Sequence, residues 1–214
     1  MITPSKEFWE IFKSTPGALS TTEAIAIMNI AAQAPKGIFL ELGSHKGKSS
    51  QCIALIVSFL KEEGTFIAVE PEFTDENWKQ PFVGTISRML PESGFGWWSK
   101  YSTEMIHEYD ELSFCFVDSG THSDDLVMNE TKMLDDRMIS GGIIAYHDCF
   151  SQFTKVTEAY EYLLSTGKYE PIEINWQEIF DYVAEHNLEE GNNSWHQYPE
   201  LPHPPNFVGA LRRK

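Results

Sequence analysis

An acidic residue and two glycines, closely spaced after an apolar run, form the clearest candidate for a ligand-binding turn. The run 37–42 (GIFLEL) leads into Glu41-Leu-Gly43-Ser-His-Lys-Gly47-Lys-Ser-Ser. Glycine at such a turn lets a ligand approach the backbone closely, because no Cβ is in the way. A helix starting after Gly47 would offer free N–H groups to an anion or a carboxylate. The stretch therefore predicts a site for a small charged ligand, although a purely structural turn between a strand and a helix would use the same glycines.

Three kinds of binding turn compete for this stretch. A dinucleotide-binding turn needs G-x-G-x-x-G, and His45 stands where its second glycine belongs. A phosphate-binding loop needs G-x-x-x-x-G-K-[ST]; residues 47–49 match its end, but Gly43 lies one residue too close. Glu41 would also bring a carboxylate near a triphosphate, which like charge disfavours. The third pattern, acidic-x-Gly-x-x-x-Gly, fits without a mismatch.

Another acid, Glu70, follows the apolar run 65–69 (TFIAV) and precedes Pro71. A carboxylate at the end of a second parallel strand is placed to accept both hydroxyls of a ribose. A phosphate-binding fold has no comparable need for it. Together with the pattern at Glu41, Glu70 favours an adenosyl ligand; taken alone, it could equally be a solvated loop carboxylate.

Asp118 and Asp148 each follow a further apolar run, in FCFVD and GIIAYHD. If these runs are neighbouring parallel strands, they lie about 4.8 Å apart, and both acids reach the carboxyl edge of the sheet, where ligands bind. Two converging carboxylates repel, so one takes up a proton or a cation enters. Oxygen ligands suit Mg²⁺ or Ca²⁺, whereas a histidine ligand suits a softer metal. The alternative is that each aspartate caps the helix that follows it.

The elements that must position these residues alternate along the chain. Strands are expected at 37–42, 65–69, 97–101, 112–117, 142–146, 169–174 and 206–212, with helices at 48–61 and 153–164. Continuous apolar strands that alternate with amphipathic helices indicate a parallel sheet buried on both faces. The predicted fold class is α/β: a Rossmann-like, doubly wound, mostly parallel seven-stranded sheet with helices on both faces.

A single domain covers 1–214 in this interpretation. Residues 1–36 form a helical lead-in, 37–175 the core and 206–214 the last strand. Residues 176–205 are rich in Glu, Asn, Trp, His and Pro. They are interpreted as an insertion outside the core, a candidate lid whose aromatic side chains suit a substrate; an oligomer contact or a surface excursion is the alternative.

Composition limits the partners. The 214 residues carry a formal net charge of −16, which repels polyanions, so nucleic acid is not expected as a partner. Runs of 18 apolar residues and an apolar leader are both missing from the sequence, so no membrane contact is expected and the location is predicted to be cytoplasmic. Cys52, Cys115 and Cys149 lie in or beside apolar runs, as reduced, buried thiols do. A homo-oligomer is left open.

Taken together, these blocks resemble class I S-adenosylmethionine-dependent methyltransferases, and in particular the small-molecule enzymes of the catechol, macrocin and cephalosporin-cluster type. The resemblance spans about residues 37–150 and the closing strand NFVGALRR. It is carried by the acids and glycines discussed above, by Gly141 and Gly142, and by the histidines His122 and His147. This chain departs from the family pattern in placing His122 one residue late, Thr121 at a frequent second aspartate, and Cys149 where metal-dependent members often carry Asp or Asn.

The resemblance implies S-adenosylmethionine as cofactor, with Mg²⁺ as an optional second one, and a small hydroxylated acceptor such as a sugar or natural product. The residues it implies for the cofactor are Glu41, Gly43, Ser44, Gly47, Ser49, Glu70, Ser102 and Asp118. For a metal it implies Asp118 and Asp148. Methyl transfer requires alignment and removal of a proton from the acceptor, for which Asp118, His122 and His147 are the candidates. His122 has a suitable unperturbed pKa of about 6.5.

Two other functions compete with methyl transfer. A P-loop-like nucleotide hydrolase is suggested by Gly47-Lys48-Ser49 and by the Walker-B-like FCFVD. A non-catalytic protein that binds an adenosyl cofactor would keep the fold and lose the chemistry. Binding of adenosylmethionine against ATP separates the first alternative from a methyltransferase.

Overall fold

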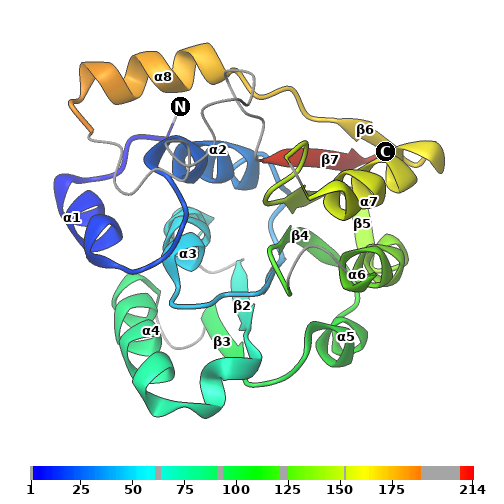
Figure 1. Cartoon of the computed structure of the whole chain (residues 1–214), viewed down its shortest axis with the longest axis horizontal. Coiled ribbons are helices and arrows are strands. Elements are labelled where there is room, and N and C mark those ends of the chain that lie inside the picture. The colour runs from blue at the N-terminus through cyan, green and yellow to red at the C-terminus, as the bar shows by residue number, and fades with distance from the viewer. Residues whose placement is uncertain (1, 61–63, 91–93, 121–124, 152, 189–207) are drawn as a thin grey trace.

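The computed structural model describes residues 2–60, 64–90, 94–120, 125–151, 153–188 and 208–214. Within them, the strands form one seven-stranded sheet in the order β3-β2-β1-β4-β5-β7-β6 (Figure 1). The first five strands in this order run parallel to one another, whereas β7 runs antiparallel to both β5 and β6. The strands are β1 (Ile38–Leu42), β2 (Thr65–Val69), β3 (Phe95–Trp98), β4 (Leu112–Val117), β5 (Met138–Tyr146), β6 (Tyr169–Pro171) and β7 (Gly209–Arg213).

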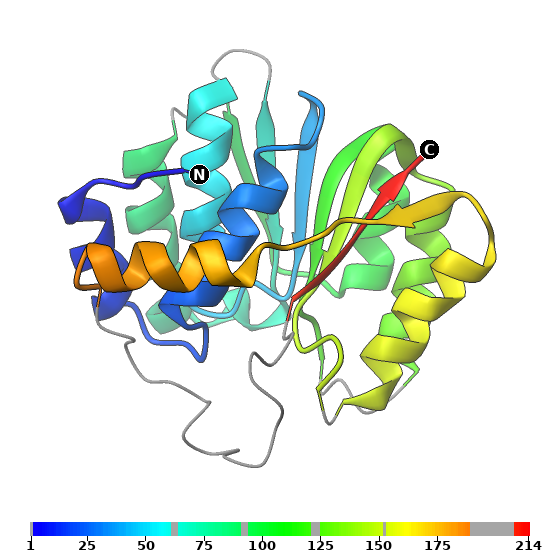
Figure 2. The same ribbon diagram turned by 90° about the horizontal axis from the view of Figure 1, so that it is seen from above.

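Helices cover both faces of the sheet, as Figure 2 shows from above. One buried apolar cluster joins α1, α2, α3, α4 and α8 to one face, and the other joins α5, α6 and α7 to the opposite face. The α-helices are α1 (Lys6–Ser14), α2 (Thr21–Ala31), α3 (Lys48–Leu60), α4 (Glu76–Met89), α5 (Ser102–Met105), α6 (Leu126–Asp135), α7 (Thr154–Ser165) and α8 (Trp176–Glu185), and the 3-10 helices are η2 (Pro71–Thr74) and η4 (Ile106–Glu108). The predicted fold class, a doubly wound and mostly parallel sheet, is confirmed. No helix in the described ranges is long and apolar enough to cross a membrane.

Register brings four strand ends to one level. Leu42, the last residue of β1, pairs with Val69 of β2 and with Val117 of β4, and Val117 pairs with Tyr146 of β5. The residues that follow these strands therefore meet at the carboxyl edge of the sheet. The strand order reverses between β1 and β4, which is where open α/β sheets bind their ligands.

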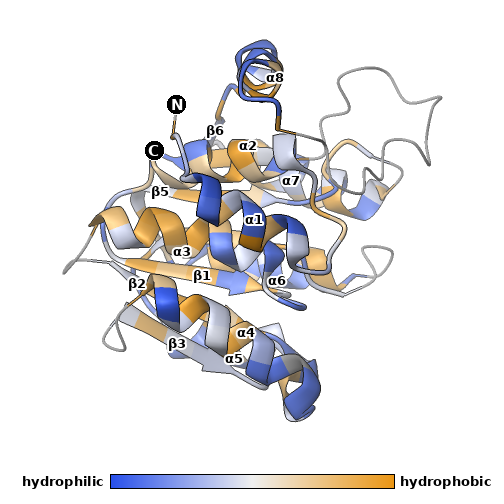
Figure 3. Cartoon of the chain, turned by 90° about the vertical axis from the view of Figure 1, so that its left-hand side faces the viewer, coloured by the Kyte–Doolittle hydropathy of each residue, from blue (hydrophilic) through white to orange (hydrophobic). Residues whose placement is uncertain are grey.

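The expectation that the segment 176–205 lies outside the core is wrong for its first part. α8 buries Ile179, Tyr182 and Val183 in the same apolar cluster as α2, because residues spaced by three and four positions share one face of a helix. Figure 3 shows this helix with its hydrophilic side turned outward. Residues 189–205 lie outside the described part of the chain, so a lid there stays a prediction.

Other elements also differ from expectation. The third strand is Phe95–Trp98, shifted from 97–101 toward the N-terminus, and α4 was not expected at all. α4 contains Pro81, a residue that removes one helical hydrogen bond and normally argues against a helix interior. Phe82 and Ile86 are fully buried on this helix, so burial of its apolar face outweighs the proline.

Candidate active site

A cavity of about 570 Å³ opens at the carboxyl edge of the sheet. Of the residues that the sequence singled out, Gly43, Ser44, Ser49, Glu70, Ser102, Asp118, His147 and Asp148 line it. Glu41 and Gly47 do not line it, and His122 lies outside the described residues. Glu41 and Gly47 are therefore set back from the cavity, and the cofactor-binding roles of the predicted residues stay predictions.

The glycine turn contains two glycines with positive φ, and these have different roles. Gly43 has φ +88°, and a Cβ there would lie 2.3 Å from the carbonyl oxygen of Asp118. The turn is fixed to β2, because the N–H groups of Gly43 and Ser44 donate to the carbonyl of Val69 at 3.0 and 3.3 Å. Gly47 has φ +86°, and a Cβ there would lie 2.5 Å from the ring of Phe82. Gly47 therefore makes room for packing on α4, and its cofactor-binding role stays a prediction.

Glu41 lies behind this turn and is completely buried. Its Oε2 accepts a hydrogen bond from the Ser50 hydroxyl, whereas its Oε1 and the Ser44 hydroxyl have no hydrogen-bond partner among the described residues. Burial raises the pKa of Glu41 to about 7, against the opposing effect of the serine hydroxyls around it. Glu41 consequently acts on the cavity through the turn, because no atom of it reaches the cavity wall.

Glu70 connects the glycine turn to the end of β2. Its Oε2 accepts a hydrogen bond from the backbone N–H of His45 at 2.7 Å, and its Oε1 accepts one from the N–H of Glu72 at 3.2 Å. The side chain is 8% exposed and faces the cavity. A carboxylate oxygen has two lone pairs, so each oxygen keeps one acceptor site for a hydroxyl of a ligand.

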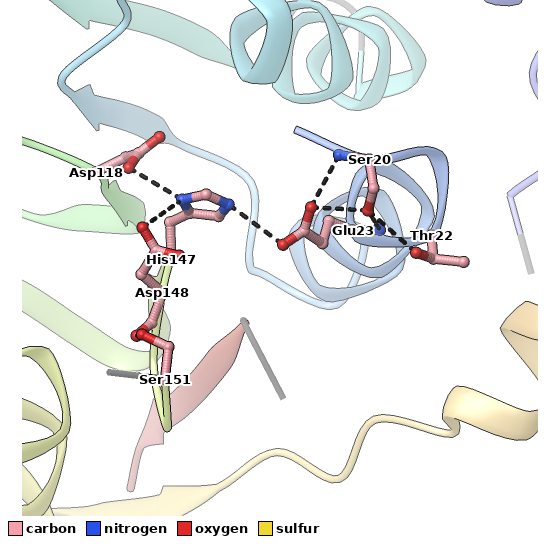
Figure 4. A network of polar contacts seen from close by, with 7 residues as sticks. All are labelled: Ser20, Thr22, Glu23, Asp118, His147, Asp148 and Ser151. Carbon is pink, nitrogen blue, oxygen red and sulfur yellow. Dashed lines mark hydrogen bonds and ion pairs between the residues drawn. The ribbon is translucent and has the colours of Figure 1, made fainter. Parts of the chain in front are cut away.

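A histidine lies between three carboxylates where β4 and β5 end (Figure 4). The Nδ1 of His147 is 3.1 Å from Oδ1 of Asp118 and 3.4 Å from Oδ2 of Asp148. Its Nε2 is 3.4 Å from Oε1 of Glu23, which comes from α2. The expected convergence of Asp118 and Asp148 is thus present, with the imidazole between them.

These carboxylates determine the charge of His147. Burial by itself lowers the pKa of the imidazole, but Asp118, Asp148 and Glu23 together raise it well above its usual value. With only these partners the imidazolium form is favoured, with Nδ1 within hydrogen-bonding distance of Asp118 and Nε2 in an ion pair with Glu23. An imidazolium has no free lone pair for a proton, so this charge state favours Asp118 over His147 as the general base, and both roles stay predictions. Asp118 remains the candidate base among the described residues.

The match to known families settles the class of protein. Residues 40–149, just over half of the chain, match a family model described as a methyltransferase domain. The chain belongs to this methyltransferase family. The P-loop hydrolase suggested by the G-K-S triplet is therefore set aside. A search of curated protein sequences gave no match.

Solved structures share the fold of this methyltransferase domain at low identity. An O-methyltransferase from Bacillus cereus in complex with S-adenosylhomocysteine (SAH) has a TM-score of 0.66 and 12% identity, covering 100% of this chain and 94% of its own. The O-methyltransferase TomG from Streptomyces achromogenes, in complex with S-adenosylmethionine, has a TM-score of 0.62 and 12% identity, covering 81% and 84%. An O-methyltransferase from Thermotoga maritima has a TM-score of 0.61 and 12% identity, covering 98% and 71%.

The N-terminal segment of the methyltransferase forms one wall of the cavity, which was not predicted from the sequence. Gly17, Ala18 and Leu19, between α1 and α2, line the cavity beside Lys48. Lys48 is 7% exposed, and its Nζ donates to the carbonyl of Gly17 at 3.3 Å and lies 4.8 Å from the centre of the Phe12 ring. No local motif marks these residues, because their place depends on how α1 and α2 pack.

Tyr101 is a second missed residue of the methyltransferase cavity. It lines the rim next to Ser102 and is 67% exposed, which is unusual for a large ring with no partner surface. The signal available in the sequence was that Tyr101 directly precedes Ser102, which was predicted to bind the cofactor. An exposed ring at a cavity rim is suited to stack on a planar ligand group.

Proposed function

We propose that the chain transfers a methyl group from S-adenosylmethionine to an oxygen of a small hydroxylated molecule, such as a sugar or natural product. The observation that carries this proposal is the pair of unpartnered buried atoms at the glycine turn, Glu41 Oε1 and Ser44 Oγ. Ser44 lines the cavity and its hydroxyl can accept a hydrogen bond from a cationic amine, and Glu41 behind it becomes anionic near neutral pH. A methionine moiety carries such an amine.

The rest of the cavity supports the same ligand. The free acceptor sites on Glu70 suit two ribose hydroxyls, and Ser49 lies in the cavity wall in the first turn of α3, where helix N–H groups favour a carboxylate. A volume of about 570 Å³ lies in the usual range for small-molecule sites. The names of the similar structures agree with an O-methyltransferase.

In the proposed reaction, the bound cofactor supplies a methyl group attached to a sulfonium. The residues of this chain hold the acceptor oxygen in line and remove its proton, and Asp118 is the proposed base. We also retain a divalent cation, Mg²⁺ or another, between Asp118 and Asp148, where it would lower the pKa of the acceptor hydroxyl. Both carboxylates line the cavity and lie on either side of Nδ1 of His147, so a cation would enter between them only in place of the proton on that nitrogen.

Ligand-induced stabilisation tests the cofactor. SAH should raise the melting temperature of the full chain through preferential binding to the folded state. ATP at the same concentration should leave it unchanged. The proposal fails if millimolar SAH gives no shift while ATP gives a clear one.

Glu70→Gln tests the ribose assignment. The amide keeps the size of the side chain but loses one acceptor oxygen, so SAH binding should weaken by tenfold or more, equivalent to about 1–3 kcal/mol. Isothermal titration calorimetry measures the dissociation constant. Glu158→Gln is the matched control, since Glu158 is exposed on α7 and does not line the cavity. An unchanged SAH dissociation constant in Glu70→Gln would show that Glu70 only stabilises the glycine turn.

A further inference from the structure

We propose that Lys48, at the cavity wall formed by residues 17–19, binds a carboxylate group of the acceptor, so that the acceptor is a hydroxylated acid. This inference rests on the proposed function and specifies the chemical class of its acceptor. Residues 17–19 lie outside the stretch 40–149 that matches the methyltransferase family, so the family match assigns no role to this wall.

The Lys48 side chain brings an ammonium group to the cavity without a negative partner. Lys48 lines the cavity and is only 7% exposed. Its Nζ contacts two neutral groups, the carbonyl oxygen of Gly17 at 3.3 Å and the face of the Phe12 ring at 4.8 Å from its centre. Among the described residues, no carboxylate lies within ion-pair distance of it. Buried lysines are almost always paired, and an ammonium has three donors, so Lys48 keeps donor capacity for an anionic ligand.

The wall is packed around the aliphatic part of this lysine. A Cβ on Gly17 would lie 3.1 Å from Cβ and 3.2 Å from Cδ of Lys48, so the lysine chain lies against the bare backbone of residue 17. The buried ring of Phe12 contacts the ammonium end of the same side chain. These contacts hold Nζ at the wall of the cavity, so a carboxylate would meet a cation that is already in position.

Lys48 and Ser49 are neighbours on α3 that act on different parts of the cavity, because successive side chains of a helix do not face the same way. The Ser49 hydroxyl favours the ionised form of Glu41, behind the glycine turn where the amino-acid end of the cofactor is proposed to bind. Lys48 instead interacts electrostatically with Glu23, whose Oε1 is 3.4 Å from Nε2 of His147. Lys48 is therefore on the side of the cavity where β5 ends and where the acceptor would meet the proposed base.

Glu23 does not neutralise Lys48, because both of its oxygens are engaged elsewhere. Its Oε2 accepts hydrogen bonds from the backbone N–H and the hydroxyl of Ser20, at 2.8 and 2.7 Å, as part of the capping box of α2, and its Oε1 faces His147 (Figure 4). Burial lowers the pKa of Lys48, and Glu23 only opposes this effect from a distance. A carboxylate on the acceptor would favour the charged ammonium, whereas a neutral acceptor would leave it buried and unpaired.

Matched acids and alcohols test the proposal on the unaltered full chain. With SAH at saturation, so that the cofactor site is filled, the protein is titrated with D-glucuronate against D-glucose and with meta-hydroxybenzoate against meta-hydroxybenzyl alcohol. Each pair differs only in a carboxylate or a hydroxymethyl group. We expect an acid to bind about tenfold or more tightly than its alcohol, through charge-assisted hydrogen bonds to Lys48. Equal affinities within both pairs, or no binding of either acid, would overturn the proposal.

Substitutions at Lys48 assign the preference to this side chain. Lys48→Met keeps the aliphatic chain and removes the charge, so the acid should lose its advantage while the alcohol binds as before. Lys48→Arg keeps the charge and should retain part of the preference. Lys13→Met is the matched control, because Lys13 is exposed on α1 and does not line the cavity. Circular dichroism checks that each variant is folded. An acid preference that survives in folded Lys48→Met would contradict the assignment.

The carboxylate of the cofactor is the other possible source of a negative group at Lys48. Methylthioadenosine lacks the amino-acid carboxylate that SAH carries, so the two ligands separate the sources. We expect Lys48→Met to bind both ligands as the wild type does. Weaker binding of SAH alone would place the cofactor at Lys48 and overturn the acceptor assignment. Failure of the proposed function would appear instead as a wild-type protein that does not bind SAH, so the two failures are distinguishable.

Discussion

Gly43→Ala is expected to destabilise the protein by more than about 3 kcal/mol and to abolish SAH binding. The left-handed backbone at Gly43 strains any residue with a side chain, by about 1–3 kcal/mol. In addition, the new Cβ would lie 2.3 Å from a backbone carbonyl oxygen of Asp118, and backbone cannot rotate away as a side chain can. The melting temperature should fall by about 6–12 °C.

Gly84→Ala is the matched control for this change. Gly84 lies inside α4, has no left-handed φ, and has no atom within 4 Å of the position that a Cβ would take. Alanine is a better helix former there by about 0.5–1 kcal/mol, so this variant should be unchanged or slightly stabilised. Differential scanning calorimetry compares the two. Similar melting temperatures for both variants would show that the contact between the turn and Asp118 is not tight.

Glu41→Gln is expected to stabilise the protein increasingly as the pH rises. The folded-state pKa of Glu41 is about 7 against 4.5 for an unburied carboxyl, so the folded state binds a proton more tightly than the unfolded state. Its contribution to stability is full below pH 4.5 and is lost as the pH rises through 7. The difference in free energy of unfolding between variant and wild type should therefore change by about 3 kcal/mol between about pH 4 and pH 8.

In the Glu41→Gln variant, SAH binding should weaken as the pH rises, whereas the gain in stability should increase. A cationic amine near the turn favours ionised Glu41, so the variant should bind SAH more weakly at pH 8 and nearly normally at pH 5, where Glu41 is already protonated. Urea unfolding and calorimetry at each pH give the two quantities. A stability difference that is flat with pH would mean that Glu41 titrates normally.

The positions of the site acids could be predicted because each follows an apolar strand. Glu70, Asp118 and Asp148 were found in this way, since parallel strands in register bring their ends to one edge. The contacts that each side chain makes at this edge could not be predicted from the sequence. Glu23 shows why: the capping box at 20–23 is visible in the sequence as a helix start, but its contact with His147 exists only once α2 has packed beside β5.

The charge of His147 and the task of Gly47 also depend on packing. From the sequence, a histidine after a strand is compatible with a general base, a metal ligand or a charged imidazolium. The three carboxylates that favour the charged form of His147 come together only in the folded chain. Gly47 matches a family motif, but in the structure its missing Cβ leaves space for the ring of Phe82 on α4. That helix was not predicted, because Pro81 argues against a helix interior. α8 was missed for a related reason, because its abundant acids and aromatic residues hide a short apolar stripe.

The order in which strands can join the sheet follows from the position of β7. β6 precedes β7 in the chain but pairs with nothing except β7 among the described strands. β6 therefore cannot dock until the later strand has added to β5, and until then the edge of β5 is open to pairing with other chains. Refolding should therefore show β6 acquiring amide-exchange protection no earlier than β7.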